Sequence, residues 1–175
     1  MNKTVGIKEK IKENIKVWLA FILGTSMLQI INYAVKNYAE INQQNQPPRD
    51  LIPGILGLTY TENPGIAFGF MFGDPDVFRI LASVLVIILL LSLVWIYKRL
   101  PLTKKAWFLR IPLILIFAGG LGNLIDRLMR GAVRDMLRFL FVDFAIFNVA
   151  DIYITVGAFA FFIFSLTIAK EIPIP

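Results

Sequence analysis

The sequence predicts an α-helical integral membrane protein with four transmembrane helices and a small extracytoplasmic β-sheet between the first two. Hydrophobic residues make up 57% of the 175 residues, and the mean hydropathy is +0.70. Soluble domains contain about 45–50% apolar residues, so lipid must cover part of this surface. Four apolar stretches reach the ~20 residues that cross a bilayer, and residues 1–175 then form a single membrane domain. The predicted spans are residues 17–35, 77–97, 106–125 and 147–169.

Between the first two spans, the chain predicts a β-like insertion at residues 51–72. Ile55–Thr61 is rich in β-branched and aromatic residues, as strands are. Asn63-Pro64-Gly65 then predicts a turn, and Ile66–Phe70 could return as a second strand. These residues would form a small sheet on the membrane surface.

The other spans differ in composition. The second is the most uniformly apolar. The third carries Gly119-Gly120-Leu121-Gly122, and small residues of this kind allow helices to approach closely. The fourth contains Asp151, whose charge at membrane depth would cost ~2.5–3.5 kcal/mol and therefore suggests a function.

Lysines and tryptophans predict the orientation. Five lysines precede the first span, and the connection between spans two and three is also basic, which predicts cytoplasmic N- and C-termini. Trp18, Trp95 and Trp107 fall at the same ends of their spans. Because the basic residues flank spans, the net charge of +6 does not indicate nucleic-acid binding. Four arginines in the opposite connection oppose the rule, and we expect carboxylates or lipid phosphates to bind them: Arg127, Arg130, Arg134 and Arg138.

The chain has no His and no Cys, which excludes a Ser–His–Asp triad, a thiol nucleophile and thiolate metal sites. Acid–base chemistry would therefore fall to carboxylates. An aspartyl pair is the simplest arrangement, because two close carboxylates share one proton. We expect Asp135 to lie in a short loop after Gly131. The polar residues predicted to meet at the outer face are Asn63, Asn123, Asp126, Arg127, Asp135, Asn148 and Asp151.

Each of these residues also has a purely structural interpretation. Asp151 could be a helix N-terminal charge and Asn148 an N-cap, while Asp126 and Arg127 could form a structural ion pair. The residues alone leave open whether the protein is a protease or a proton-coupled carrier.

Three motifs resemble those of bacterial lipoprotein signal peptidases (signal peptidase II). Glu62–Gly69 is similar to the family's E-N-x-G-x-A-F-G segment. Gly122–Arg127 followed by Gly131–Asp135 resembles its G-N-x-x-D-R…G-x-V-x-D signature, and Phe147–Asp151 resembles its F-N-x-A-D motif.

The resemblance implies an intramembrane aspartyl endopeptidase of the bacterial cytoplasmic membrane, with its active site near the extracytoplasmic face. It would remove signal peptides from diacylglyceryl-modified prolipoproteins at the lipobox cysteine. It implies no cofactor and no metal. It also implies that the protein contacts membrane phospholipid and acts as a monomer. Asp135 and Asp151 would be catalytic. Substrate-binding or supporting roles would fall to Asn63, Gly65, Asn123, Arg127 and Asn148, with Asp126 supporting Arg127.

The chain departs from the family in the first span, where D-x-x-x-K is usual. Leu28 and Asn32 stand at the expected positions of this pair. We interpret the change as the joint loss of a structural ion pair, which predicts that activity survives. The alternative is a catalytically inactive relative that binds lipoprotein precursors.

Overall fold

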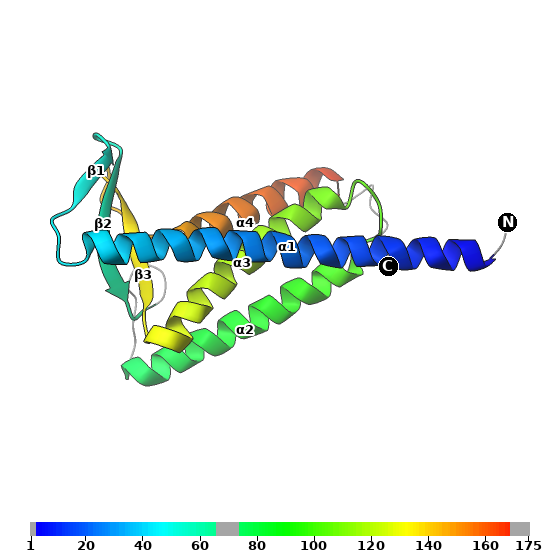
Figure 1. The fold of residues 1–175 in the computed structure, drawn as a ribbon, viewed down its shortest axis with the longest axis horizontal. Coiled ribbons are helices and arrows are strands. Elements are labelled where there is room, and N and C mark those ends of the chain that lie inside the picture. Colours follow the sequence, from blue (N-terminus) through cyan, green and yellow to red (C-terminus); the bar gives the residue numbers. More distant parts are fainter. Residues whose placement is uncertain (1–2, 66–73, 169–175) are drawn as a thin grey trace.

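The computed structural model describes residues 3–65 and 74–168. Over these two ranges the chain forms four helices and a three-stranded sheet (Figure 1). Each helix is long and apolar enough to cross a membrane. In chain order the elements are α1 (Lys3–Gln43), β1 (Arg49–Ile52), β2 (Leu56–Asn63), α2 (Pro75–Arg99), α3 (Trp107–Arg130), β3 (Val133–Phe139) and α4 (Val149–Ile168).

Helix α3 forms the centre of the bundle. In the most apolar 18-residue segment of α3, 61% is buried inside the molecule, compared with 11–22% for the other three helices. These three expose apolar side chains outward, as lipid-facing helices do. Helices α3 and α4 approach closely at Gly119, where a Cβ atom would clash with the carbonyl oxygen of Ala150. This close approach brings the start of α4 against α3, as the predicted small-residue segment requires.

Helix α1 is much longer than the predicted span of residues 17–35. Its 41 residues correspond to about 60 Å, roughly twice the hydrocarbon core of a bilayer. At the end of the predicted span Val35, and beyond it Ala39, pack with the sheet residues Leu58 and Met136. Residues 36–43 thus connect the bundle to the sheet.

The three strands are antiparallel in the order β1-β2-β3. Strand β2 confirms the strand predicted at 55–61, but its second neighbour comes from the distant connection between α3 and α4. The sheet therefore extends beyond the predicted insertion at residues 51–72. The return strand predicted at Ile66–Phe70 lies outside the described residues.

Asp135 lies on β3, where it pairs with Thr61 of β2, so its predicted placement in a loop is wrong. Gly131 does provide the predicted turn, since it caps α3 in the left-handed region with φ 81°. The chain then enters β3 immediately, because the edge of β2 supplies hydrogen-bond partners for its backbone.

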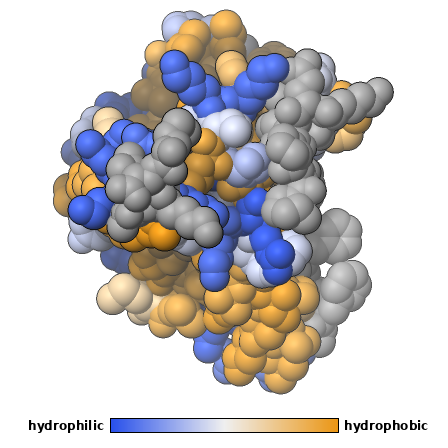
Figure 2. Space-filling view, turned by 90° about the vertical axis from the view of Figure 1, so that its right-hand side faces the viewer, coloured by the Kyte–Doolittle hydropathy of each residue, from blue (hydrophilic) through white to orange (hydrophobic). Residues whose placement is uncertain are grey.

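We call the end of the bundle that carries the three strands the sheet end. Figure 2 shows the opposite end, where hydrophilic residues gather while hydrophobic residues cover the flanks. The basic residues Lys98 and Arg99 end α2 on that side. The molecule thus has an apolar middle and two polar ends, as a membrane-spanning bundle requires.

Candidate active site

The start of α4 is fixed by a reciprocal capping arrangement. The backbone N–H of Asp151 donates to Asn148 Oδ1 at 3.1 Å, and the backbone N–H of Asn148 donates to Asp151 Oδ2 at 3.0 Å. Such a capping box satisfies two N–H groups that a helix start otherwise leaves unpaired. The structural interpretation of Asn148 as an N-cap is confirmed. It does not exclude chemistry, because both side chains have further polar contacts.

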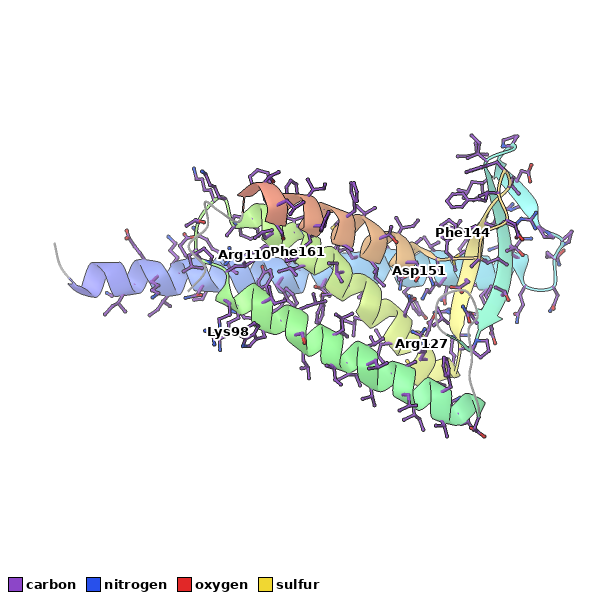
Figure 3. The ribbon with its side chains drawn as sticks, turned by 180° about the vertical axis from the view of Figure 1, so that it is seen from behind. Lys98, Arg110, Arg127, Phe144, Asp151 and Phe161 are labelled. Carbon is purple, nitrogen blue, oxygen red and sulfur yellow. The ribbon has the colours of Figure 1, made fainter. Side chains whose placement is uncertain are left out.

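Two amide side chains connect Asp151 with Asp135. Asn148 Nδ2 donates to Asp135 Oδ1 at 2.6 Å and to Asn123 Oδ1 at 3.2 Å. Asn123 Nδ2 in turn donates to Asp151 Oδ1 at 2.7 Å. The two aspartates come from a strand and a helix, yet they share one hydrogen-bonded network at the sheet end, where Figure 3 labels Asp151.

Asp135 is the more deeply buried carboxylate, with 3% of its surface exposed. Burial raises the pKa of Asp135 to about 6, and the charge of Asp151 adds to this, although hydrogen bonds from Asn148 and Asn63 oppose it. Asn63 Nδ2 donates to Asp135 Oδ2 at 3.1 Å. A carboxyl group with a raised pKa beside a second carboxylate is able to hold a shared proton.

Asp126 lies in a buried ion cluster behind the aspartates. Its carboxylate pairs with Lys36 Nζ at 2.8 Å and with Arg134 Nη2 at 2.9 Å. Arg134 also pairs with Glu40, which binds Arg130 at 2.7 Å. The expectation that carboxylates bind the arginines of this connection is confirmed for Arg130 and Arg134.

The structural alternative, an ion pair of Asp126 with Arg127, is not formed among the described residues. The two residues are adjacent on α3, so their side chains leave the helix in directions about 100° apart. Asp126 points to α1 and β3, where Lys36 and Arg134 lie. The cluster reaches the aspartates through Lys36, which also donates to Asn123 Oδ1 at 3.0 Å.

Lys36 also corrects the interpretation of the first span. It is fully buried, and it lies four residues after Asn32, the spacing of the D-x-x-x-K pattern. The pattern therefore fits one helical turn later than Leu28 and Asn32, with its lysine present and Asn32 in place of the aspartate. Leu28 packs against the apolar core. The spacing of Asn32 and Lys36 was the available sequence signal for this residue.

Arg127 lies between the aspartates and the turn after β2. Its Nη2 donates to the carbonyl oxygen of Gly65 at 3.2 Å, while its buried Nε has no partner among the described residues. Asn63 Oδ1 accepts from the Gly65 N–H at 2.9 Å, which holds the turn. All eight predicted site residues thus belong to one connected region, to which the structure adds Lys36, Glu40 and Arg134.

The site consists of carboxylates, amides and cationic side chains. Over residues 3–65 and 74–168, the structure contains no cluster of three or more carboxylates that could hold a metal ion. A carboxylate pair supported by amide donors can activate water and protonate a carbonyl oxygen, which is the chemistry of aspartic peptidases.

Comparison with known families gives a direct match. The family described as Signal peptidase (SPase) II matches residues 16–167, which is most of the chain. The chain belongs to the signal peptidase II family. This is a family of aspartic-type peptidases, and the matched segment includes every predicted site residue.

Individual relatives agree with this assignment. A lipoprotein signal peptidase of Streptococcus thermophilus (strain CNRZ 1066) is 42% identical over 70% of this chain and 76% of its own length. One from Streptococcus pyogenes serotype M5 (strain Manfredo) is 37% identical over 79% of this chain and 85% of its own. A solved bacterial membrane enzyme structure, obtained by the in meso method at 2.3 Å resolution, has a TM-score of 0.71 at 29% identity. That match covers 87% of this chain and 90% of the solved chain.

Proposed function

We propose that this protein is an intramembrane aspartyl endopeptidase that removes signal peptides from diacylglyceryl-modified prolipoproteins at the lipobox cysteine. The observation that carries the proposal is a hydrogen-bonded network at the sheet end of the four apolar helices, formed by Asp135, Asn148, Asn123 and Asp151. Membership of a family of lipoprotein signal peptidases supports the substrate class. An aspartyl pair supports peptide hydrolysis by a chain that has no His and no Cys.

In this proposal the two carboxyl groups have different roles. Asp135 holds the shared proton, because burial raises its pKa to about 6. Ionised Asp151 takes a proton from water, whose oxygen forms a bond to the scissile carbonyl carbon, while Asp135 gives its proton to the carbonyl oxygen. The resulting gem-diol collapses when the C–N bond breaks. The amine nitrogen then takes the proton held by Asp151, and a hydroxyl proton returns to Asp135.

The amide and guanidinium groups around the pair have positioning roles. Asn123 and Asn148 hold one carboxylate oxygen each through side-chain N–H groups, so the pair keeps a fixed orientation. Arg127 lies beside the aspartates and already donates to the backbone carbonyl oxygen of Gly65, and we assign its guanidinium the role of binding the peptide carbonyls of the substrate. Asn63 and Gly65 form the turn beside it.

We also propose an orientation and a context. The termini face the cytoplasm of a bacterium and the aspartates face outward, since Lys98 and Arg99 end α2 at the side away from the sheet. The enzyme acts as a monomer surrounded by membrane phospholipid, because the aspartate network is complete within a single chain.

The test is a gel-shift cleavage assay on a purified diacylglyceryl-modified prolipoprotein. We expect Asp135→Asn and Asp151→Asn each to lower kcat by about 10³-fold or more, because each variant removes one member of a unit. Asp143→Asn is the matched control, since Asp143 is an exposed carboxylate near the same end of the molecule. A wild-type protein that binds the precursor without cleaving it would instead establish the inactive alternative.

A further inference from the structure

A second hollow lies beside the site, between α2 and α3 at the sheet end. It has a volume of about 530 Å³. Arginines 79, 127 and 130 line it together with the aliphatic side chains of Ile80, Val84 and Ile87. The arginines lie toward the sheet end of their helices and the aliphatic residues continue along α2 into the apolar middle of the bundle. We call this hollow the α2–α3 groove.

The wall of the groove is suited to a hydrocarbon chain. Ile80, Val84 and Ile87 follow the i, i+4, i+7 spacing of one helical face, and each is at least 40% exposed. From Ile80 to Ile87 the wall extends about 10 Å along α2. An acyl chain could therefore lie along it parallel to the helix.

The rim offers hydrogen-bond donors from three arginines. Arg79 pairs with Asp76 at 3.0 Å, and Arg130 pairs with Glu40 at 2.7 Å. These two cations are largely compensated, while Arg127 donates to carbonyl oxygens of the chain itself. A guanidinium keeps several N–H groups free after one such contact, and they suit the ester carbonyl oxygens of a lipid.

The groove is also continuous with the aspartate site. Arg127 lines the groove and donates to the carbonyl oxygen of Gly65. Gly65 in turn donates to Asn63, which binds Asp135. Arg127 thus connects the rim of the groove directly with the turn beside Asp135.

We propose that the α2–α3 groove receives an acyl chain of the diacylglyceryl group on the substrate cysteine, with ester carbonyls at the arginine rim. This inference rests on the proposed function. The cysteine follows the scissile bond directly, so its lipid leaves the site next to the aspartates. Arg127 marks the point where such a lipid would enter the groove.

The test uses Val84→Phe, which fills the groove, and Leu85→Phe as its control. Leu85 is the next residue on α2 and is 62% exposed, but it does not line the groove. With a diacylglyceryl-modified prolipoprotein carrying long acyl chains, we expect Val84→Phe to raise KM about tenfold with kcat within twofold of wild type. Leu85→Phe should leave both constants unchanged.

Acyl-chain length provides the decisive readout. With a substrate that carries very short acyl chains, the effect of Val84→Phe on KM should disappear, which general damage to the fold would not produce. Ile87→Phe is a second variant that should show the same length dependence. Arg79→Gln should raise KM for both substrates, while Arg99→Gln at the other end of α2 should not.

The experiment distinguishes a failure of the groove inference from a failure of the proposed function. If wild type cleaves and Val84→Phe behaves as Leu85→Phe does with both substrates, the groove inference is wrong and the proposed function stands. A Val84→Phe effect that depends on added anionic phospholipid, and not on the acyl length of the substrate, would overturn it in favour of a phospholipid site. If wild type cleaves no modified precursor, the proposed function itself fails.

Discussion

The two ends of the bundle both bury a cation, but they bind it in different ways. At the sheet end, Lys36 and Arg134 share the carboxylate of Asp126. At the opposite end, Arg110 is 1% exposed and donates to the carbonyl oxygens of Leu100 and Pro101 at 2.8 and 3.0 Å. Figure 3 labels Arg110 there, far from Asp151.

The partners explain the difference in role. Arg110 is surrounded by neutral carbonyls and by the rings of Tyr97 and Trp107, which is enough to stabilise the connection between α2 and α3. Lys36 instead reaches both a carboxylate and Asn123, which holds Asp151. We therefore expect substitutions around Lys36 to change activity, and substitutions around Arg110 to change stability alone.

The largest expected effect is on the ion cluster. Asp126→Leu leaves Lys36 and Arg134 buried without their shared carboxylate, so we expect it to lower the free energy of unfolding by about 3–5 kcal/mol. Denaturant titration in a fixed detergent would measure this loss. Activity should also fall, because Lys36 would no longer be held against Asn123. A variant as stable as wild type would show that the cluster does not stabilise the sheet end.

A second prediction separates the two placements of the D-x-x-x-K pattern. Leu28→Asp puts a charge against the apolar core, and we expect it to cost about 2.5–3.5 kcal/mol. Adding Asn32→Lys should not restore stability, because the new lysine would lie four residues from Lys36 and would crowd Gly122. Thermal unfolding of the single and double variants decides the question. If the double variant were as stable as wild type, positions 28 and 32, and not 32 and 36, would correspond to the D-x-x-x-K pattern.

The sequence predicted which residues meet at the aspartates, but it did not predict strand β3 or the ion cluster behind them. Asn148 and Asp151 share a three-residue spacing at a helix start, a pattern that is visible without a structure. Strand β3 could not be recognised, because its charged residues obscure the alternation and its partner residues in β2 lie about 70–80 positions away. Lys36 and Asp126 are 90 positions apart in the sequence, so no local pattern indicated that they form an ion pair.

The third prediction concerns Asp135 and pH. Its pKa is about 6 in the folded protein against 3.8 when it is unperturbed, so the cost of its charge is absent below pH 4 and grows as pH rises through 6. Asp135→Asn removes this titration. We expect the variant to gain about 2–3 kcal/mol relative to wild type between pH 4 and pH 8. Thermal unfolding across this range measures the difference, and a difference independent of pH would show that Asp135 has an ordinary pKa. Asp143→Asn is the control, because Asp143 is exposed.

The smallest effect is expected at the opposite end. Arg110→Met keeps most of the side-chain volume but leaves the carbonyl oxygens of Leu100 and Pro101 without a donor, which should cost about 1–3 kcal/mol. It leaves no carboxylate unpaired, so the loss should be smaller than for Asp126→Leu. Both kcat and KM for the modified precursor should equal those of wild type at a temperature where the variant is folded. A specific fall in kcat would mean that the two ends are coupled through α3, and the contrast between a structural and a functional buried cation would then fail.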